Sequence, residues 1–166
     1  SPSRELNAPY DVAITTIGDS TYAVVTGYVD DGVQIIDISD PTSPSATARL
    51  EDGTDNDVCT AANGEKCLDG AVDVEIATIG GSTYAVVAGS LDDGIEIIDI
   101  STPASPSSVS VVLDNADREL DGANGVAITT IGSSTYAVVT GTNDDGISII
   151  DISTPSSPVY VSELED

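Results

Sequence analysis

The chain has 166 residues, of which 29 are acidic and 4 are basic, so that its formal net charge at pH 7 is −25. This charge excludes nucleic-acid phosphates and anionic lipid surfaces as natural partners and favours cations as counter-ligands. Hydrophobic residues make up 40% of the chain, which excludes a disordered acidic polymer, and no apolar run approaches the length that spans a membrane.

The first part of the chain contains four β-rich runs separated by turn residues. An Asp-Asp-Gly turn at 30–32 precedes the third run, and a Pro-x-Ser-Pro turn at 41–44 follows it. Proline stops a strand, so the third run is expected to end before this second turn. The short connections predict an antiparallel meander. The runs are expected at Val12 to Gly18, Ser20 to Gly27, Gly32 to Ser39 and Ser45 to Leu50.

An inserted loop at residues 53–65 follows this first unit, and the two cysteines of the chain lie in and next to it. With no second pair and no histidine to complete a zinc site, Cys59 and Cys67 predict a local disulfide. A disulfide implies an oxidising compartment, and a chain that begins at Ser1 without methionine agrees with a chain that is processed or excised from something longer.

The same loop offers three closely spaced carboxylates, Asp52, Asp55 and Asp57. Such oxygen ligands suit calcium, although no glutamate occupies the closing position of an EF-hand loop. A solvated acidic loop is the alternative. No cofactor is required by the sequence, and Ca²⁺ is the one that it could hold.

The same pattern then returns twice along the chain. The segment Ser-Thr-Tyr-Ala-Val-Val at 20–25 recurs at 82–87 and 134–139, and Ile-Ile-Asp-Ile-Ser at 35–39 recurs at 97–101 and 149–153. We therefore expect one repeat domain, 1–166, built from units at 4–52, 66–114 and 118–166. The aspartate inside each apolar run, at Asp37, Asp99 and Asp151, is expected to accept hydrogen bonds and to be structural.

The repeated Asp-Asp-Gly turns allow two interpretations. Asp-Gly between two strands is typical of a hairpin turn, whereas paired carboxylates beside a glycine resemble oxygen-rich calcium loops. The turn interpretation is favoured because the triplet occurs once in each unit at the same place. The residues concerned are Asp30, Asp31, Asp92, Asp93, Asp144 and Asp145.

The strands carry apolar residues on both faces. In the third run Val33 and Ile35 point to one face while Ile36 and Ile38 point to the other. A lone four-stranded sheet cannot bury both faces, but sheets stacked around an axis can, as in a propeller. The predicted fold is all-β, with three tandem four-stranded antiparallel propeller-type blades.

The segment Asp-Asp-Gly-Val-Gln-Ile-Ile-Asp-Ile-Ser-Asp-Pro-Thr-Ser-Pro at 30–44 resembles the LVIVD-repeat group of β-propeller proteins. The resemblance implies four-stranded blades in exported or cell-surface proteins of bacteria and archaea. It carries no catalytic residues that could be transferred to this chain.

Three blades are fewer than the four to eight of a closed propeller. If Asp166 of one copy were followed by Ser1 of another, the spacing from Arg118 to the next Arg4 would equal that from Lys66 to Arg118. Two copies could close a six-bladed ring, many could form a fibre, or the chain could be one segment of a longer repeat array. Completion by head-to-tail or dimeric assembly is therefore expected.

These features favour a structural or interaction protein, extracellular or on a cell surface, whose blades mediate homo-assembly into a ring or filament. A calcium-dependent adhesion or ligand-binding module is the alternative. A carboxylate-based glycosidase is less favoured, because no carboxylate breaks the repeat symmetry and no Trp, Phe or His is present to line a pocket. The protein is accordingly expected not to be an enzyme, with no nucleic-acid partner and no membrane insertion.

Overall fold

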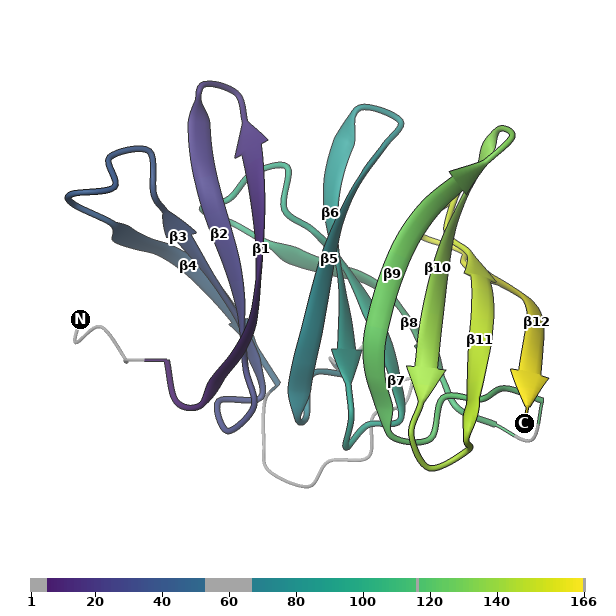
Figure 1. Cartoon of the computed structure of the whole chain (residues 1–166). Helices are drawn as coiled ribbons and strands as arrows, with labels where there is room; N and C mark the ends of the chain where they lie inside the picture. Colours follow the sequence, from purple (N-terminus) through teal and green to yellow (C-terminus); the bar gives the residue numbers. More distant parts are fainter. Residues whose placement is uncertain (1–5, 53–66, 116, 166) are drawn as a thin grey trace.

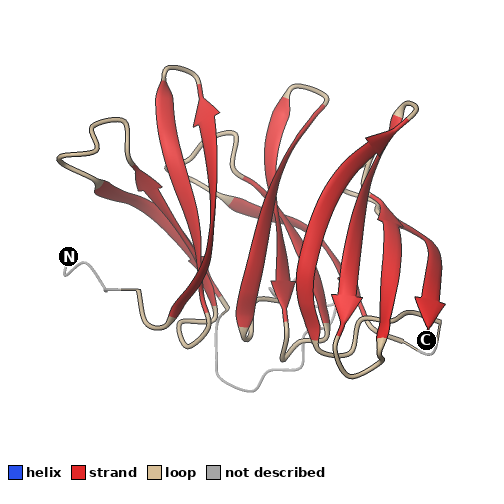
Figure 2. Cartoon of the chain, viewed as in Figure 1, coloured by secondary structure: helices blue, strands red, loops and turns tan. Residues whose placement is uncertain are grey.

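A computed structural model of the chain describes residues 6–52, 67–115 and 117–165. These ranges contain strands and loops (Figure 1, Figure 2), and no helix among them is long and apolar enough to cross a membrane. The strands form three four-stranded sheets, each with neighbouring strands antiparallel and in chain order. They are β1 Pro9–Ile17, β2 Ser20–Gly27, β3 Gly32–Asp37 and β4 Ser45–Glu51 in the first sheet, β5 Ala71–Ile79, β6 Ser82–Gly89, β7 Gly94–Asp99 and β8 Ser107–Leu113 in the second, and β9 Ala123–Ile131, β10 Ser134–Gly141, β11 Gly146–Asp151 and β12 Val159–Glu165 in the third.

The Asp-Asp-Gly turn joins the second and third strands of every sheet. Its second aspartate has a φ of +47° at Asp31, +54° at Asp93 and +56° at Asp145. Aspartate tolerates this left-handed conformation better than most residues. The glycine that follows pairs with the last residue of the second strand, as Gly32 does with Gly27, so the triplet fixes the register of the hairpin.

The Ile-Asp-Ile-Ser motif ends the third strand of each sheet. Asp37 Oδ1 accepts the Ser39 N–H at 2.8 Å, and Ser39 Oγ accepts the Thr21 N–H of β2 at 3.0 Å. The hydrogen bonds from the Ser39 side chain and N–H lower the pKa of Asp37. The same two bonds form at Asp99 and Ser101 and at Asp151 and Ser153, which confirms the structural role predicted for these aspartates.

Two expected strand boundaries are wrong by two or three residues, and two others differ by one, since β1 ends at Ile17 rather than Gly18 and β4 at Glu51 rather than Leu50. The first run begins at Pro9 rather than Val12, where a bulge between Pro9 and Val12 lets the strand start earlier. The third run ends at Asp37 rather than Ser39, because the Asp37 carboxylate turns the chain by binding the Ser39 N–H.

The three sheets stack face to face as blades. The first strands lie nearest one another, since β1 contacts β5 and β5 contacts β9, while the later strands fan out behind them (Figure 1). Both faces of the middle sheet are covered: Val86 and Ile97 belong to the core against the third sheet, and Ala85 and Ile98 belong to the core against the first, all four being fully buried. The all-β, propeller-type blade architecture is confirmed.

Candidate functional site at the blade junctions and outer sheet faces

The first aspartate of each Asp-Asp-Gly turn binds the entry segment of its own blade. Asp30 Oδ2 accepts the Asn7 N–H at 2.7 Å, and Asp92 and Asp144 accept the N–H groups of Asp69 and Asp121 at 2.8 Å. Each carboxylate thus joins the turn to the residues that precede the first strand.

The second aspartate reaches the next blade. Asp31 Oδ1 accepts the Gly70 N–H at 3.1 Å, and Asp93 Oδ1 accepts the Gly122 N–H at 2.9 Å. Both donors belong to buried glycines, and hydrogen bonds from a backbone amide to a charged carboxylate are among the stronger ones. We call these bonds the turn clasps. Asp145 has the same turn conformation, but within the described chain no blade follows it.

Calcium binding at these turns stays a prediction; in the structure these carboxylates accept hydrogen bonds from backbone N–H groups. In the inserted loop, Asp55, Asp57 and Cys59 lie outside the described residues. Asp52 lies at the end of β4, where its N–H donates to the Asp31 carbonyl at 2.7 Å. Cys67 is fully buried, and its predicted pairing with Cys59 stays a prediction.

A second bond between blades lies on the first strands. Asp11 Oδ2 accepts the Val74 N–H at 3.1 Å, and Asp73 Oδ2 accepts the Val126 N–H at 2.7 Å. We call these the axial clasps. The corresponding residue of the third blade is Gly125, so this blade carries no carboxylate at the axial position.

The side chains of Asp11 and Asp73 interact, and each shifts the pKa of the other. Burial and the hydrogen bond to Asp11 raise the pKa of Asp73, and the charge of Asp11 adds to this. Burial alone would raise the pKa of Asp11 as well, but hydrogen bonds from Asp73, Val12 and Val74 lower it. The pair therefore favours a shared proton.

We expect the Asp73→Asn variant to be more stable than the parent chain at pH 7. The folded-state pKa of Asp73 is raised, so the folded state binds this proton more tightly and ionisation weakens it. Stability of the parent chain should rise as the pH falls through the raised pKa toward the ordinary aspartate value of 3.8, and the advantage of asparagine should disappear there. Urea denaturation across this pH range measures the difference.

Asp37→Asn is a control for which stability is expected to change with pH in the opposite direction. The folded-state pKa of Asp37 is lowered, so the stability that Asp37 contributes is present above 3.8 and is lost as the pH falls through the lowered pKa. A stability difference for Asp73→Asn that does not change with pH would contradict the shared proton.

The outer faces of the end blades expose residues that are buried at the same repeat position elsewhere. Val12 on β1 is 53% exposed, whereas Val74 and Val126 are 2% and 5% exposed. Leu164 on β12 is 68% exposed, whereas Val112 of the middle blade is 6% exposed. We call the outer face of the first sheet, with Val12 and Ile14, the head face. The outer face of the third sheet, with Ile131, Ile149, Val161 and Leu164, is the tail face.

Arg118 also joins two blades. Its Nη1 donates to the Leu113 carbonyl at the end of β8 at 2.7 Å, and its guanidinium lies 5.8 Å from the ring centre of Tyr160 on β12. A backbone carbonyl and an aromatic ring thus receive the guanidinium. Arg4 and Lys66 lie outside the described residues.

Three carboxylates that the sequence did not single out gather beside β12. Oxygens of Glu119, Glu163 and Glu165 lie within 4.8 Å of one another. Burial raises the pKa of Glu119, and the charges of Asp144 and Glu165 add to this. No repeat motif contains all three residues, so no sequence signal could have found them.

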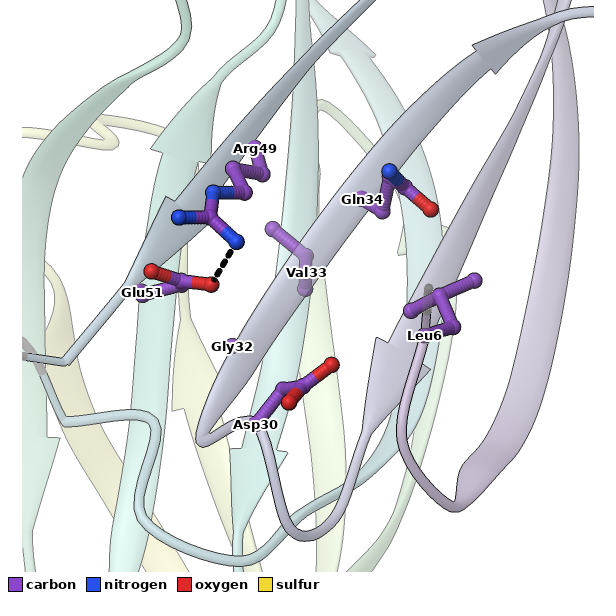
Figure 3. A pocket seen from close by; sticks show the side chains of 7 residues that line it. All are labelled: Leu6, Asp30, Gly32, Val33, Gln34, Arg49 and Glu51. Atoms are coloured by element: carbon purple, nitrogen blue, oxygen red, sulfur yellow. Dashed lines mark ion pairs between the residues drawn. The ribbon is translucent and has the colours of Figure 1, made fainter. Parts of the chain in front are cut away.

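A small pocket lies at the turn end of the first blade (Figure 3). Leu6, Asp30 and Gln34 line one side of it, and Arg49 and Glu51 of β4 form an ion pair of 2.5 Å on the other. Its volume of about 10 Å³ is about what one water molecule needs. The pocket is too small for a substrate.

Comparison with solved structures finds similar folds at low sequence identity. A functionally unknown protein from Desulfotomaculum acetoxidans has a TM-score of 0.68 and 13% identity, with 96% of this chain and 43% of that chain covered. A protein from Lactobacillus plantarum has a TM-score of 0.62 and 15% identity, with coverage of 95% and 42%. The exo-β-1,3-galactanase from Phanerochaete chrysosporium has a TM-score of 0.57 and 12% identity, with coverage of 94% and 38%.

These similarities concern the fold alone, and the chain spans less than half the length of the structures that it matches. A search of curated proteins finds no match. The family model of the LVIVD repeat matches residues 20–51, 76–114 and 133–166, one match in each blade. The chain therefore belongs to the LVIVD-repeat family.

Proposed function

We propose that this chain is a structural or interaction protein whose blades continue into those of a second copy, with the tail face of one chain packed on the head face of the next. One observation carries the proposal: a single repeat position is 2% exposed at Val74, inside the stack, and 53% exposed at Val12, on its end. The second copy would cover Val12 as the first blade covers Val74.

The packing energy favours such an addition. Burying one exposed aliphatic side chain contributes about 1.5–3 kcal/mol, and the two faces together expose several, including Ile14 at 57% and Leu164 at 68%. Ordering two chains offsets part of this gain. The interface would repeat one that the chain already makes twice within itself.

The turn clasps support the same direction of assembly. Ala8 has a φ of +52° at the position of Gly70 and Gly122, which have +62° and +64°. Ala8 also accepts the N–H of the following turn at 3.0 Å, as Gly70 does at 3.1 Å. The Ala8 N–H can therefore donate a hydrogen bond to the Asp145 carboxylate of a second copy, as the Gly122 N–H donates to Asp93.

The low coverage of the similar structures agrees with a stack that extends past three blades. Whether two copies form a ring or many form a filament is an outcome of the experiment. The proposed location is extracellular or on a cell surface, following the predicted disulfide, and no enzymatic activity is proposed. A calcium-dependent adhesion module is the second candidate, because carboxylates gather at every blade junction.

We expect light scattering after size-exclusion chromatography to show association that strengthens with protein concentration and with NaCl. Salt shortens the screening length from about 10 Å at 0.1 M to about 3 Å at 1 M, and each copy carries a net charge of −25. Val12→Asp should weaken the association at least about tenfold, because about 1.5 kcal/mol of burial is lost.

Val29→Asp is the matched control. Val29 is 54% exposed, close to the 53% of Val12, but it lies in the β2–β3 turn and not on the head face. The Val29→Asp variant should self-associate as strongly as the parent chain. A monomer at high concentration and high salt, or equal effects of the two variants, would overturn the proposal. If chelation dissociates the assembly and calcium but not NaCl restores it, the calcium module is favoured instead.

A further inference from the structure

An open cleft of about 490 Å³ lies at the end of the blades where the first strands begin. This volume falls within the usual range of small-molecule sites, about 300–1,000 Å³. All three blades contribute to it, and every lining residue is uncharged. They are Ala8, Tyr10, Tyr28, Val72, Ser90, Gly122, Asn124, Thr142 and Asn143.

The repeats diverge at the lining positions although they agree beside them. Strands β2 and β10 have the same sequence, Ser-Thr-Tyr-Ala-Val-Val-Thr-Gly. The next residue is Tyr28 in the first blade and Thr142 in the third. Along the first strands, one repeat position holds Tyr10, Val72 and Asn124 in turn. Tyr10 and Asn124 are exposed, so packing does not require these two side chains, whereas a ligand site can use them.

The first blade lacks a side-chain hydrogen bond to a backbone carbonyl that the other two blades make. Ser90 Oγ donates to the Gly70 carbonyl and Thr142 Oγ1 to the Gly122 carbonyl, both at 2.9 Å. At the same position Tyr28 keeps the backbone bond to the Ala8 carbonyl, at 3.0 Å. Its ring instead lies 6.3 Å from that of Tyr10. Tyr10 is 65% exposed, so the pair forms an aromatic surface within reach of solvent.

The polar groups of the cleft present mainly acceptors. The hydroxyl protons of Ser90 and Thr142 are used on backbone carbonyls, which leaves oxygen lone pairs for a ligand. Asn143 donates its Nδ2 to Asp121 Oδ1 at 2.7 Å and keeps its carbonyl oxygen as an acceptor. Asn124 is exposed. A ligand rich in hydroxyl donors fits this arrangement.

The charge of the molecule narrows the ligand class further. A net charge of −25 disfavours anions, and a lining without carboxylates gives a cation no ion-pair partner. A pyranose ring has an apolar face that packs on tyrosine and hydroxyl groups that donate to amides and hydroxyls. We propose that this cleft binds a neutral carbohydrate, with one sugar ring packed on Tyr10 and its hydroxyls directed to Asn124 and Asn143. The inference does not depend on the proposed assembly.

The test is titration of the full chain with maltotetraose, cellotetraose and laminaritetraose, followed by two-dimensional NMR of the backbone amides. We expect saturable shifts at the cleft residues with at least one of these sugars. Tyr10→Ala should weaken the affinity about tenfold and Tyr10→Phe should retain it, since the ring and not its hydroxyl makes the contact. Asn124→Ala should weaken it as well.

Val29→Ala is the control, because Val29 is as exposed as the head-face valine and neighbours Tyr28 without lining the cleft. Binding should persist in Val12→Asp, so failure of the assembly would leave this inference intact. No saturable shifts with any of the three sugars, an equal affinity for Tyr10→Ala, or tighter binding of a neutral Asn- and Thr-containing peptide would overturn it.

Discussion

Replacing Ile97 by alanine is expected to cost about 3 kcal/mol of unfolding free energy, whereas the same change at Ile149 should cost under about 1 kcal/mol in the lone chain. Both isoleucines occupy the same position of the third strand of their blades. Ile97 is fully buried between the second and third sheets, and its truncation leaves a cavity there. Ile149 lies on the tail face and is only half-buried, so water can fill the space.

Urea denaturation measures both free energies. For a chain of this size the loss at Ile97 corresponds to a fall of about 6–12 °C in Tm. Ile97→Val, which removes one methylene group, should cost about 0.5–1.5 kcal/mol and calibrates the cavity effect. Equal losses at Ile97 and Ile149 would mean that the tail face is already covered in the lone chain. Where the chain associates, Ile149→Ala should weaken the association.

The second large effect is expected at the turn clasps. Asp93→Ala leaves the buried Gly122 N–H without the acceptor that lies at 2.9 Å, and an unsatisfied buried donor costs about 1–3 kcal/mol. Alanine is also strained at the φ of +54° that Asp93 adopts. The measured loss of unfolding free energy will therefore contain both contributions.

Asp145→Ala separates the two contributions. Asp145 has a φ of +56°, so alanine is strained there to the same degree, but no blade in the described chain receives its carboxylate. The difference between the two alanine variants is then the energy of the clasp.

Asp93→Asn should restore the unfolding free energy that Asp93→Ala loses, since the amide oxygen still accepts a hydrogen bond and asparagine tolerates this conformation. Burial raises the pKa of Asp93, so a neutral side chain is expected to be at least as stable at pH 7. If Asp93→Ala and Asp145→Ala lose the same unfolding free energy, the turn clasp does not contribute to stability.

The sequence predicts most of the blade, because the signals for strands and turns are local. The apolar residues on both faces of 32–39, the Asp-Asp-Gly turn and the closing prolines each depend on neighbours only a few residues away. They therefore predict the strand order and the demand for stacked sheets. The strand ends were less accurate, because a bulge and an aspartate side chain move them by two or three residues.

The candidate sites could be predicted only in part. Repetition of the Asp-Asp-Gly triplet marks it as structural, but no local pattern tells which amide of another blade each carboxylate binds. The Gly70 and Gly122 partners are 39 and 29 residues away along the chain. The cleft was missed for a related reason: Tyr10, Ser90 and Asn124 come together only when the three blades meet.

The glycine at position 125 has a consequence for how an array of these chains would come apart. Within one chain, Asp11 and Asp73 tie each first strand to the next, but Gly125 offers nothing comparable to a following chain. Boundaries between chains would thus be the weakest links of the array. Dilution or low salt would release folded three-bladed chains rather than unfolded polypeptide. These chains could then associate again.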